Sequence, residues 1–283
     1  MKRLLLVLLL LLAPAAAAGA DGGPSPGTTV GWDGVVSPSG LVRYVTIPGR
    51  TGTTLAVVRV HDGRVVNFLN LPGSFGVPLV TQNGEAGGLS RDGGTLILAT
   101  YAGPGPNGST RFAVFGTKRL HLSRVVTLKG SYSYDALSPD AKTAYLIQYT
   151  QGATETRYRV RALDLASGRL LPGAIADKRL WGDYMRGYPV SRATAKDGGW
   201  VYTLYGKNDG TAFVHMLDAK HRAAVCVNLP WRHTQNAIGL VRLSLRGGQL
   251  VLSQRKSGML ATVDTTSFAV RAFHRPEAPS IQG

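Results

Sequence analysis

Aromatic and charged side chains gather in one stretch of the chain, between Trp181 and Tyr188. Rings beside an aspartate and an arginine can stack on a flat or sugar-like ligand while the charges fix its orientation. The opposing interpretation is that these rings plug a channel or pack over the edge of a sheet. The side chains predicted to bind a ligand, here and in neighbouring loops, are Trp181, Asp183, Tyr184, Arg186, Tyr188, Trp231, His233, Asn236 and Tyr134.

Oxygen donors in the same class of loops are candidates for a metal site. Asn83, Glu85 and Asp135 would offer the mixed amide and carboxylate shell that Ca²⁺ prefers. Their spacing matches no metal-ligand motif, so calcium is a hypothesis without a motif behind it. With a metal there, His233 or Glu85 could act as a base. The alternative function is therefore a metal-dependent hydrolase or lyase acting on lactones or glycans.

Other catalytic signatures are absent from the sequence. It has no phosphate-binding glycine loop, no His-Glu-x-x-His, no Cys-x-x-Cys and no Gly-x-Ser-x-Gly. The only cysteine, Cys226, lies in an apolar strand and is predicted to be a buried, inert thiol. Four histidines fall on outer strands or their turns and are predicted to face solvent, namely His61, His121, His215 and His221.

A repeated turn predicts the elements that would position these residues. A small residue leads into a tight polar turn, and a short apolar strand follows at once, a strong hairpin signal. Successive copies lie about 48 to 57 residues apart, and a second hairpin follows each one. The copies begin at Ser37, Ser90, Ser138, Ala195 and Ser244.

This period is typical of propeller blades, which repeat a four-stranded antiparallel sheet around a channel. We therefore predict an all-β propeller of four-stranded blades, five by count, and not a β-sandwich. The turn followed by an Asp-x-x-x-Gly-Arg hairpin, as at Asp164–Arg169, resembles the YVTN and quinoprotein-amine-dehydrogenase-like propellers. The resemblance covers nearly all of the repeat region. It rests on blade-building residues, so it implies a fold and no catalytic residue.

The first residues resemble a secretory signal peptide. Lys2 and Arg3 precede a leucine run that is too short to span a membrane, and a small-x-small end follows near Ala20. We predict a signal peptide over 1–20, a flexible leader over 21–29, one propeller domain over 30–276 and a tail over 277–283. A secreted, extracytoplasmic protein with no transmembrane segment in the mature chain is expected.

Charge is the extreme feature of the composition. The 32 Lys and Arg residues against 16 Asp and Glu give a formal net charge of +16. Such a field attracts anionic polymers, although genomic enrichment in arginine would give the same count. No nucleic-acid-binding motif is present. We expect a non-catalytic binding or scaffold module at the cell envelope, with its ligand at the loop-rich channel mouth and an anionic polymer or another protein as partner.

Overall fold

The computed structural model describes residues 27–100, 108–151, 156–180 and 182–278, and most of its regular structure is strand. These residues form four four-stranded sheets, one three-stranded sheet and one two-stranded ribbon. All paired strands within them run antiparallel. Among the described residues, the only helical segment is the short 3-10 turn η1 (Ile238–Leu240).

We number the larger sheets in chain order. Sheet 1 holds β2 (Gly34–Val36), β3 (Val42–Pro48), β4 (Gly52–Arg59) and β5 (Val65–Pro72). Sheet 2 holds β7 (Thr95–Ala99), β8 (Ser109–Gly116) and β9 (His121–Lys129). Sheet 3 holds β10 (Ser131–Leu137), β11 (Thr143–Gln151), β12 (Thr156–Asp164) and β13 (Arg169–Leu170). Sheet 4 holds β14 (Tyr188–Thr194), β15 (Trp200–Gly206), β16 (Ala212–Asp218) and β17 (Ala223–Asn228). Sheet 5 holds β18 (Arg242–Arg246), β19 (Gln249–Gln254), β20 (Gly258–Asp264) and β21 (Val270–Ala272).

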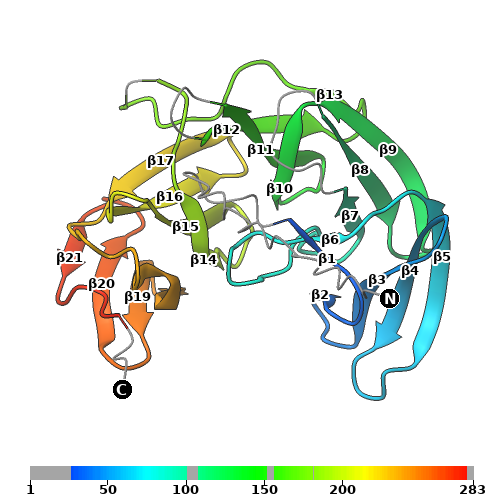
Figure 1. The fold of residues 1–283 in the computed structure, drawn as a ribbon, viewed down its shortest axis with the longest axis horizontal. Coiled ribbons are helices and arrows are strands. Elements are labelled where there is room, and N and C mark those ends of the chain that lie inside the picture. The colour runs from blue at the N-terminus through cyan, green and yellow to red at the C-terminus, as the bar shows by residue number, and fades with distance from the viewer. Residues whose placement is uncertain (1–26, 101–107, 152–155, 181, 279–283) are drawn as a thin grey trace, which may run out of the picture.

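The five sheets follow one another around an arc, with sheets 1 and 5 at its two ends (Figure 1). Hydrophobic clusters join each sheet to the next. Leu55 and Leu96 share one cluster, and Ile97 and Leu146 share another. Further along the arc, Tyr145 packs with Leu217, and Val214 packs with Leu250. Within the described residues, no such cluster joins sheet 5 to sheet 1, so closure of a five-bladed ring stays a prediction.

The repeated turns form as their residue types predict. At Ser138-Pro139-Asp140, the serine hydroxyl donates to the aspartate carboxylate over 2.6 Å and accepts the Thr143 N–H. Ser90 and Asp92 repeat the arrangement, again at 2.6 Å. These bonds satisfy the backbone groups that the tight turn leaves unpaired, since Ser and Asp side chains can replace backbone partners. In the four-stranded sheets each turn joins the first and second strands, and in sheet 2 it joins Leu89 to β7, where Leu89 pairs with Leu96.

The predicted leader is corrected at its C-terminal end. Thr28 and Thr29 form β1, which pairs with β6 (Val77–Pro78) and so belongs to the folded part of the chain. The predicted signal peptide lies outside the described residues. None of the described segments is a helix with the length and apolar character of a membrane span.

A segment after β6, residues 79–87, crosses the inside of the arc. The Gln82 N–H donates to the Pro189 carbonyl over 2.8 Å. The Asn83 side-chain amide donates to the carbonyls of Val190 at 2.8 Å and Gly239 at 3.1 Å. The segment therefore ties the region before sheet 2 to sheet 4 and to the connection between sheets 4 and 5.

Candidate ligand-binding pocket at the centre of the arc

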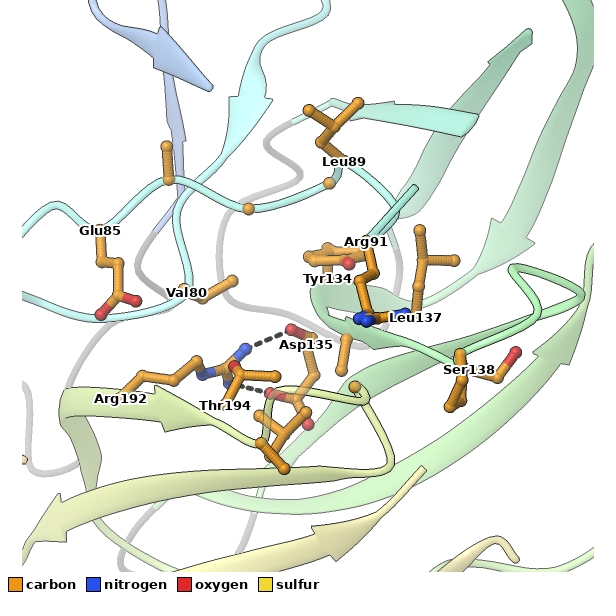
Figure 2. Close-up of a pocket in the computed structure, with 18 of the residues that line it drawn as sticks. Val80, Glu85, Leu89, Arg91, Tyr134, Asp135, Leu137, Ser138, Arg192 and Thr194 are labelled. Atoms are coloured by element: carbon orange, nitrogen blue, oxygen red, sulfur yellow. Dashed lines mark hydrogen bonds and ion pairs between the residues drawn. The ribbon is translucent and has the colours of Figure 1, made fainter. Parts of the chain in front are cut away.

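The central pocket lies between the inner strands β10 and β14 and the segment that leads into sheet 2. Its volume is about 280 Å³. Residues 85–89 and Arg91 form one wall, and the repeated turns at Ser138-Pro139 and Lys196–Gly198 form its rim. Figure 2 shows side chains from these elements pointing into the shared space. The pocket thus forms where the first hairpin turns of consecutive sheets converge.

A buried ion pair stands inside the pocket. The Arg192 guanidinium of β14 donates to the Asp135 carboxylate and to the Asp135 backbone carbonyl on β10 (Figure 2). Only 7% of the Arg192 side chain and 4% of the Asp135 side chain are exposed. Arg192 also donates to the Thr203 hydroxyl at 3.1 Å. Because the guanidinium and the carboxylate are bound to each other, the pair is a fixed structural element that joins sheets 3 and 4.

Electrostatics keep Arg192 charged. Burial by itself would lower the pKa of Arg192, but the neighbouring Asp135 carboxylate outweighs it and the pKa is raised. Tyr134, next in the chain, is buried, and this burial raises the pKa of its hydroxyl. Neither group exchanges protons near neutral pH. These two side chains are therefore fixed groups of the pocket, while burial raises the pKa of the Glu85 carboxyl at its wall.

Two cations stand on the rim. The Arg91 Nε donates to the Lys196 backbone carbonyl over 2.6 Å, so the two turns are in direct contact. Both side chains belong to exposed residues, and within the described chain neither has a carboxylate partner. They occupy the same position of the repeated turn, directly after Ser90 and Ala195. Their charges are thus available to an anionic group that enters the pocket.

The aromatic stretch predicted to bind a ligand lies elsewhere. Met185 pairs with Tyr158 of β12 along the edge away from β11, so residues 182–187 cover the outer edge of sheet 3. Asp183 forms an ion pair with Arg159 at 3.3 Å, and the same guanidinium stands 5.3 Å from the centre of the Tyr184 ring. This is the edge-covering arrangement that the sequence left open as the opposing interpretation.

The other predicted ligand-binding residues are scattered. Trp231 is only 3% exposed, because it packs in the cluster between sheets 4 and 5 and donates its indole N–H to the His274 carbonyl at 3.0 Å. It has almost no surface for a ligand, which corrects that prediction. His233 and Asn236 are exposed in the same connection. Of the whole set, Tyr134 alone lines the central pocket, and Trp181 lies outside the described residues. The remaining members, Arg186 and Tyr188, are exposed and partly exposed respectively.

The three metal candidates do not present a shared set of oxygen ligands. The Asp135 carboxylate is bound by Arg192, and the Asn83 amide nitrogen is bound to two carbonyls. Glu85 is exposed at the pocket wall. In the described part of the chain, no group of three or more His, Cys, Asp or Glu side chains is placed to hold a metal ion. The geometry brings Glu85 and Asp135 to one pocket, where Arg192 stands with them.

Sequence reasoning missed Arg91, Lys196 and Arg192 as site residues. It placed the site at the end of the channel where long loops emerge, whereas this pocket lies at the end formed by the repeated turns. The signal was present in the repeat itself. In the five copies, the position after the first residue holds Pro38, Arg91, Pro139, Lys196 and Leu245, so the second and fourth turns carry a cation where the other three do not.

Comparison with known proteins gives the fold class. No protein-family model matches the chain, and no curated protein matches its sequence. The β-propeller domain of Cps50 (Swd1) from Myceliophteria thermophila has a TM-score of 0.52 at 13% identity, over 87% of this chain and 71% of that one. The dihydro-heme d1 dehydrogenase NirN has a TM-score of 0.49 at 13% identity, over 89% and 46%. TolB from Acinetobacter baumannii has a TM-score of 0.42 at 11% identity, over 83% and 52%.

Identities this low define the fold alone. The first of these structures identifies the chain as similar to β-propellers, and the predicted all-β propeller architecture is confirmed. The YVTN-like family and the count of five blades stay predictions.

Proposed function

We propose that this protein is an exported, non-catalytic binding module of the cell envelope that holds an anionic group in the central pocket. The observation that carries the proposal is the proximity of two cations without a carboxylate partner, Arg91 and Lys196, at the rim of a pocket in which Asp135 is already paired with Arg192. Available cations at the mouth of the pocket favour binding of an anionic group there. The signal-peptide-like start of the chain supports the proposal that the protein is exported. The repeated turns support the proposal that it belongs to the YVTN-like family.

The proposed ligand is a phosphate or carboxylate group carried by an envelope polymer. The pocket volume of about 280 Å³ suits one such group with a short stretch of chain, since sites for whole small molecules start near this size. A formal net charge of +16 draws the polymer toward the surface, while the two rim cations select the point of entry. Specific binding at the rim and general attraction by the surface charge then depend on different residues. Substitutions can therefore test the two contributions separately.

Binding of labelled polyphosphate and labelled polygalacturonate, at low and high salt, tests the proposal. Arg91→Gln with Lys196→Gln should weaken binding about tenfold or more, since a hydrogen bond to a charged group contributes about 1.5 kcal/mol. High salt should weaken binding further because it screens the remaining surface charges.

A second double variant, Arg64→Gln with Lys220→Gln, removes the same charge from exposed turns of sheets 1 and 4 and is the matched control. It should lose much less affinity. Equal losses in the two double variants would show that general charge alone attracts the polymer. Polymer binding that is unchanged by salt and by both double variants would show that charge does not carry it and would contradict the proposal.

A further inference from the structure

Three soft or nitrogen-bearing side chains meet on the outer part of sheet 4. Cys226 on β17 stands directly opposite His215 on β16, so both side chains share one face of the sheet. The Cys226 Sγ lies 3.5 Å from the His215 Nδ1 and 4.0 Å from the Met185 Sδ. His215 and Cys226 meet within one hairpin, and the packing of the edge segment onto sheets 3 and 4 brings Met185 to them.

Backbone pairing holds each member in place. His215 and Cys226 are fixed by the β16–β17 register. Met185 is fixed by two hydrogen bonds with Tyr158, in which its N–H donates over 2.7 Å and its carbonyl accepts over 3.1 Å. The Cys226 N–H donates to the Asp177 carboxylate at 2.8 Å, which anchors the strand from its other side. The arrangement is therefore set by the scaffold and needs no rearrangement of the backbone.

The imidazole lacks a strong partner, although it is buried. His215 is 1% exposed, which corrects the prediction that it faces solvent. Its Nε2 has no hydrogen-bond partner, and its Nδ1 faces only the thiol. Buried polar groups normally have hydrogen-bond partners, and a thiol is a weak one. The ring nitrogen nearest the sulfur is thus free to bind something stronger.

The two separations measured from the Cys226 Sγ match those between ligands of one metal ion. With metal–sulfur bonds of about 2.3 Å and metal–nitrogen bonds of about 2.0 Å, a trigonal ion separates two sulfur ligands by about 4.0 Å and a sulfur from a nitrogen by about 3.7 Å. The two separations in the structure are 4.0 and 3.5 Å. A small pocket of about 170 Å³, lined by Met185, Cys226, Lys207 and Asn228, leads to the sulfurs from outside.

We propose that Met185, His215 and Cys226 form a binding site for a soft monovalent cation, Cu⁺. Thiolate and thioether ligands select Cu⁺, and imidazole is compatible with it, whereas structural zinc sites take four ligands. Asp177 does not supply a fourth ligand, because its carboxylate accepts hydrogen bonds from Arg179 and from the Cys226 N–H. On binding, the thiol proton leaves to solvent as the sulfur–copper bond forms, and copper stays in its +1 state throughout.

Anaerobic titration of the purified full chain with Cu⁺, against a chromophoric Cu⁺ chelator, tests this site. One ion should bind per chain, with one proton released in a weakly buffered solution. Cys226→Ala should abolish that stoichiometric binding. Met185→Leu, which preserves volume, should weaken it by more than about tenfold, the smallest loss typical even of an outer partner of a metal site. Met259→Leu, at an exposed methionine on β20, is the control and should bind as the parent does.

Two results would overturn the assignment. Unchanged affinity in Met185→Leu would remove the thioether from the site. Tighter binding of Zn²⁺ than of Cu⁺ would show that the ligand set is neither soft nor three-coordinate. Ag⁺, which has no accessible redox chemistry here, should raise the melting temperature of the parent and of Met259→Leu but not that of Cys226→Ala, because a ligand specific to the folded state stabilises it.

Discussion

The Asn83 side-chain amide donates a hydrogen bond to the Val190 carbonyl over 2.8 Å, although 107 positions separate the two residues. The bond joins the segment that crosses the inside of the arc to the inner strand of sheet 4. It also places the wall of the central pocket opposite β14.

Asn83→Ala should therefore loosen the pocket wall. It removes the donor of two hydrogen bonds at an exposed residue, so the free energy of unfolding should fall by only about 1 kcal/mol. The larger effect should be local, with faster amide exchange over residues 79–87 while the sheets keep their protection. Hydrogen exchange measured by mass spectrometry checks this, with Asn67→Ala on the exposed strand β5 as the control. Unchanged exchange over 79–87 would mean that the backbone hydrogen bonds of the segment, such as Gln82 to Pro189, hold it without the Asn83 side chain.

Breaking the Arg192–Asp135 pair should be costly. Arg192→Met leaves the Asp135 carboxylate buried without its partner, and loss of one member of a buried pair typically costs about 3–5 kcal/mol. Asp135→Leu in the same chain removes the stranded charge and should restore part of that loss. Urea unfolding of the two single variants and the double variant measures the coupling. Additive losses would show that the two side chains act independently.

Ala141→Gly should stabilise the protein. The equivalent turn residues Gly40, Gly93 and Gly198 have φ values of 73°, 71° and 73°, and Ala141 takes the same left-handed region with a φ of 53°. A side chain is disfavoured there, so glycine should raise the free energy of unfolding by up to about 1 kcal/mol. Gly40→Ala is the mirror experiment, because a Cβ at that position meets no atom within 4 Å and only the backbone conformation is changed. It should destabilise the fold by a similar amount.

Alkaline stability should depend on Tyr145. The residue is fully buried and donates its hydroxyl proton to the Ala219 carbonyl at 2.8 Å, and burial raises the pKa of the hydroxyl from 10.0 to about 12. The unfolded chain loses that proton first, so the contribution is complete below pH 10 and is lost as the pH rises through 12. Between pH 8 and 11 the unfolding free energy of the parent should fall by about 1 kcal/mol more than that of Tyr145→Phe. Tyr184→Phe, at an exposed ring, should follow the parent.

Local sequence signals predicted the hairpins, because a tight turn needs particular residues wherever it occurs. They failed at His215 for a physical reason. Every residue of β16 is buried, because sheet 4 packs against neighbours on both faces. A strand covered on both faces does not alternate between polar and apolar residues, so its sequence does not show which side chains face solvent. The pocket was misplaced for a similar reason. Loop composition indicated Trp181 to Tyr188, whereas the pocket depends on where the crossing segment and two distant turns meet.

The crossing segment also affects the order in which parts of the protein can fold during synthesis. Asn83 leaves the ribosome well before its two acceptors, which follow 107 and 156 residues later. Sheets 1 and 2 can pack as they emerge, because their contacts are between neighbours. The tip of the crossing segment, at Gln82 and Asn83, has no partner across the arc until residues 189–190 and Gly239 have been made. A nascent chain that stops before sheet 4 would thus carry folded sheets 1 and 2 and an unfinished interior, and the central pocket would form only after sheet 4 has been made.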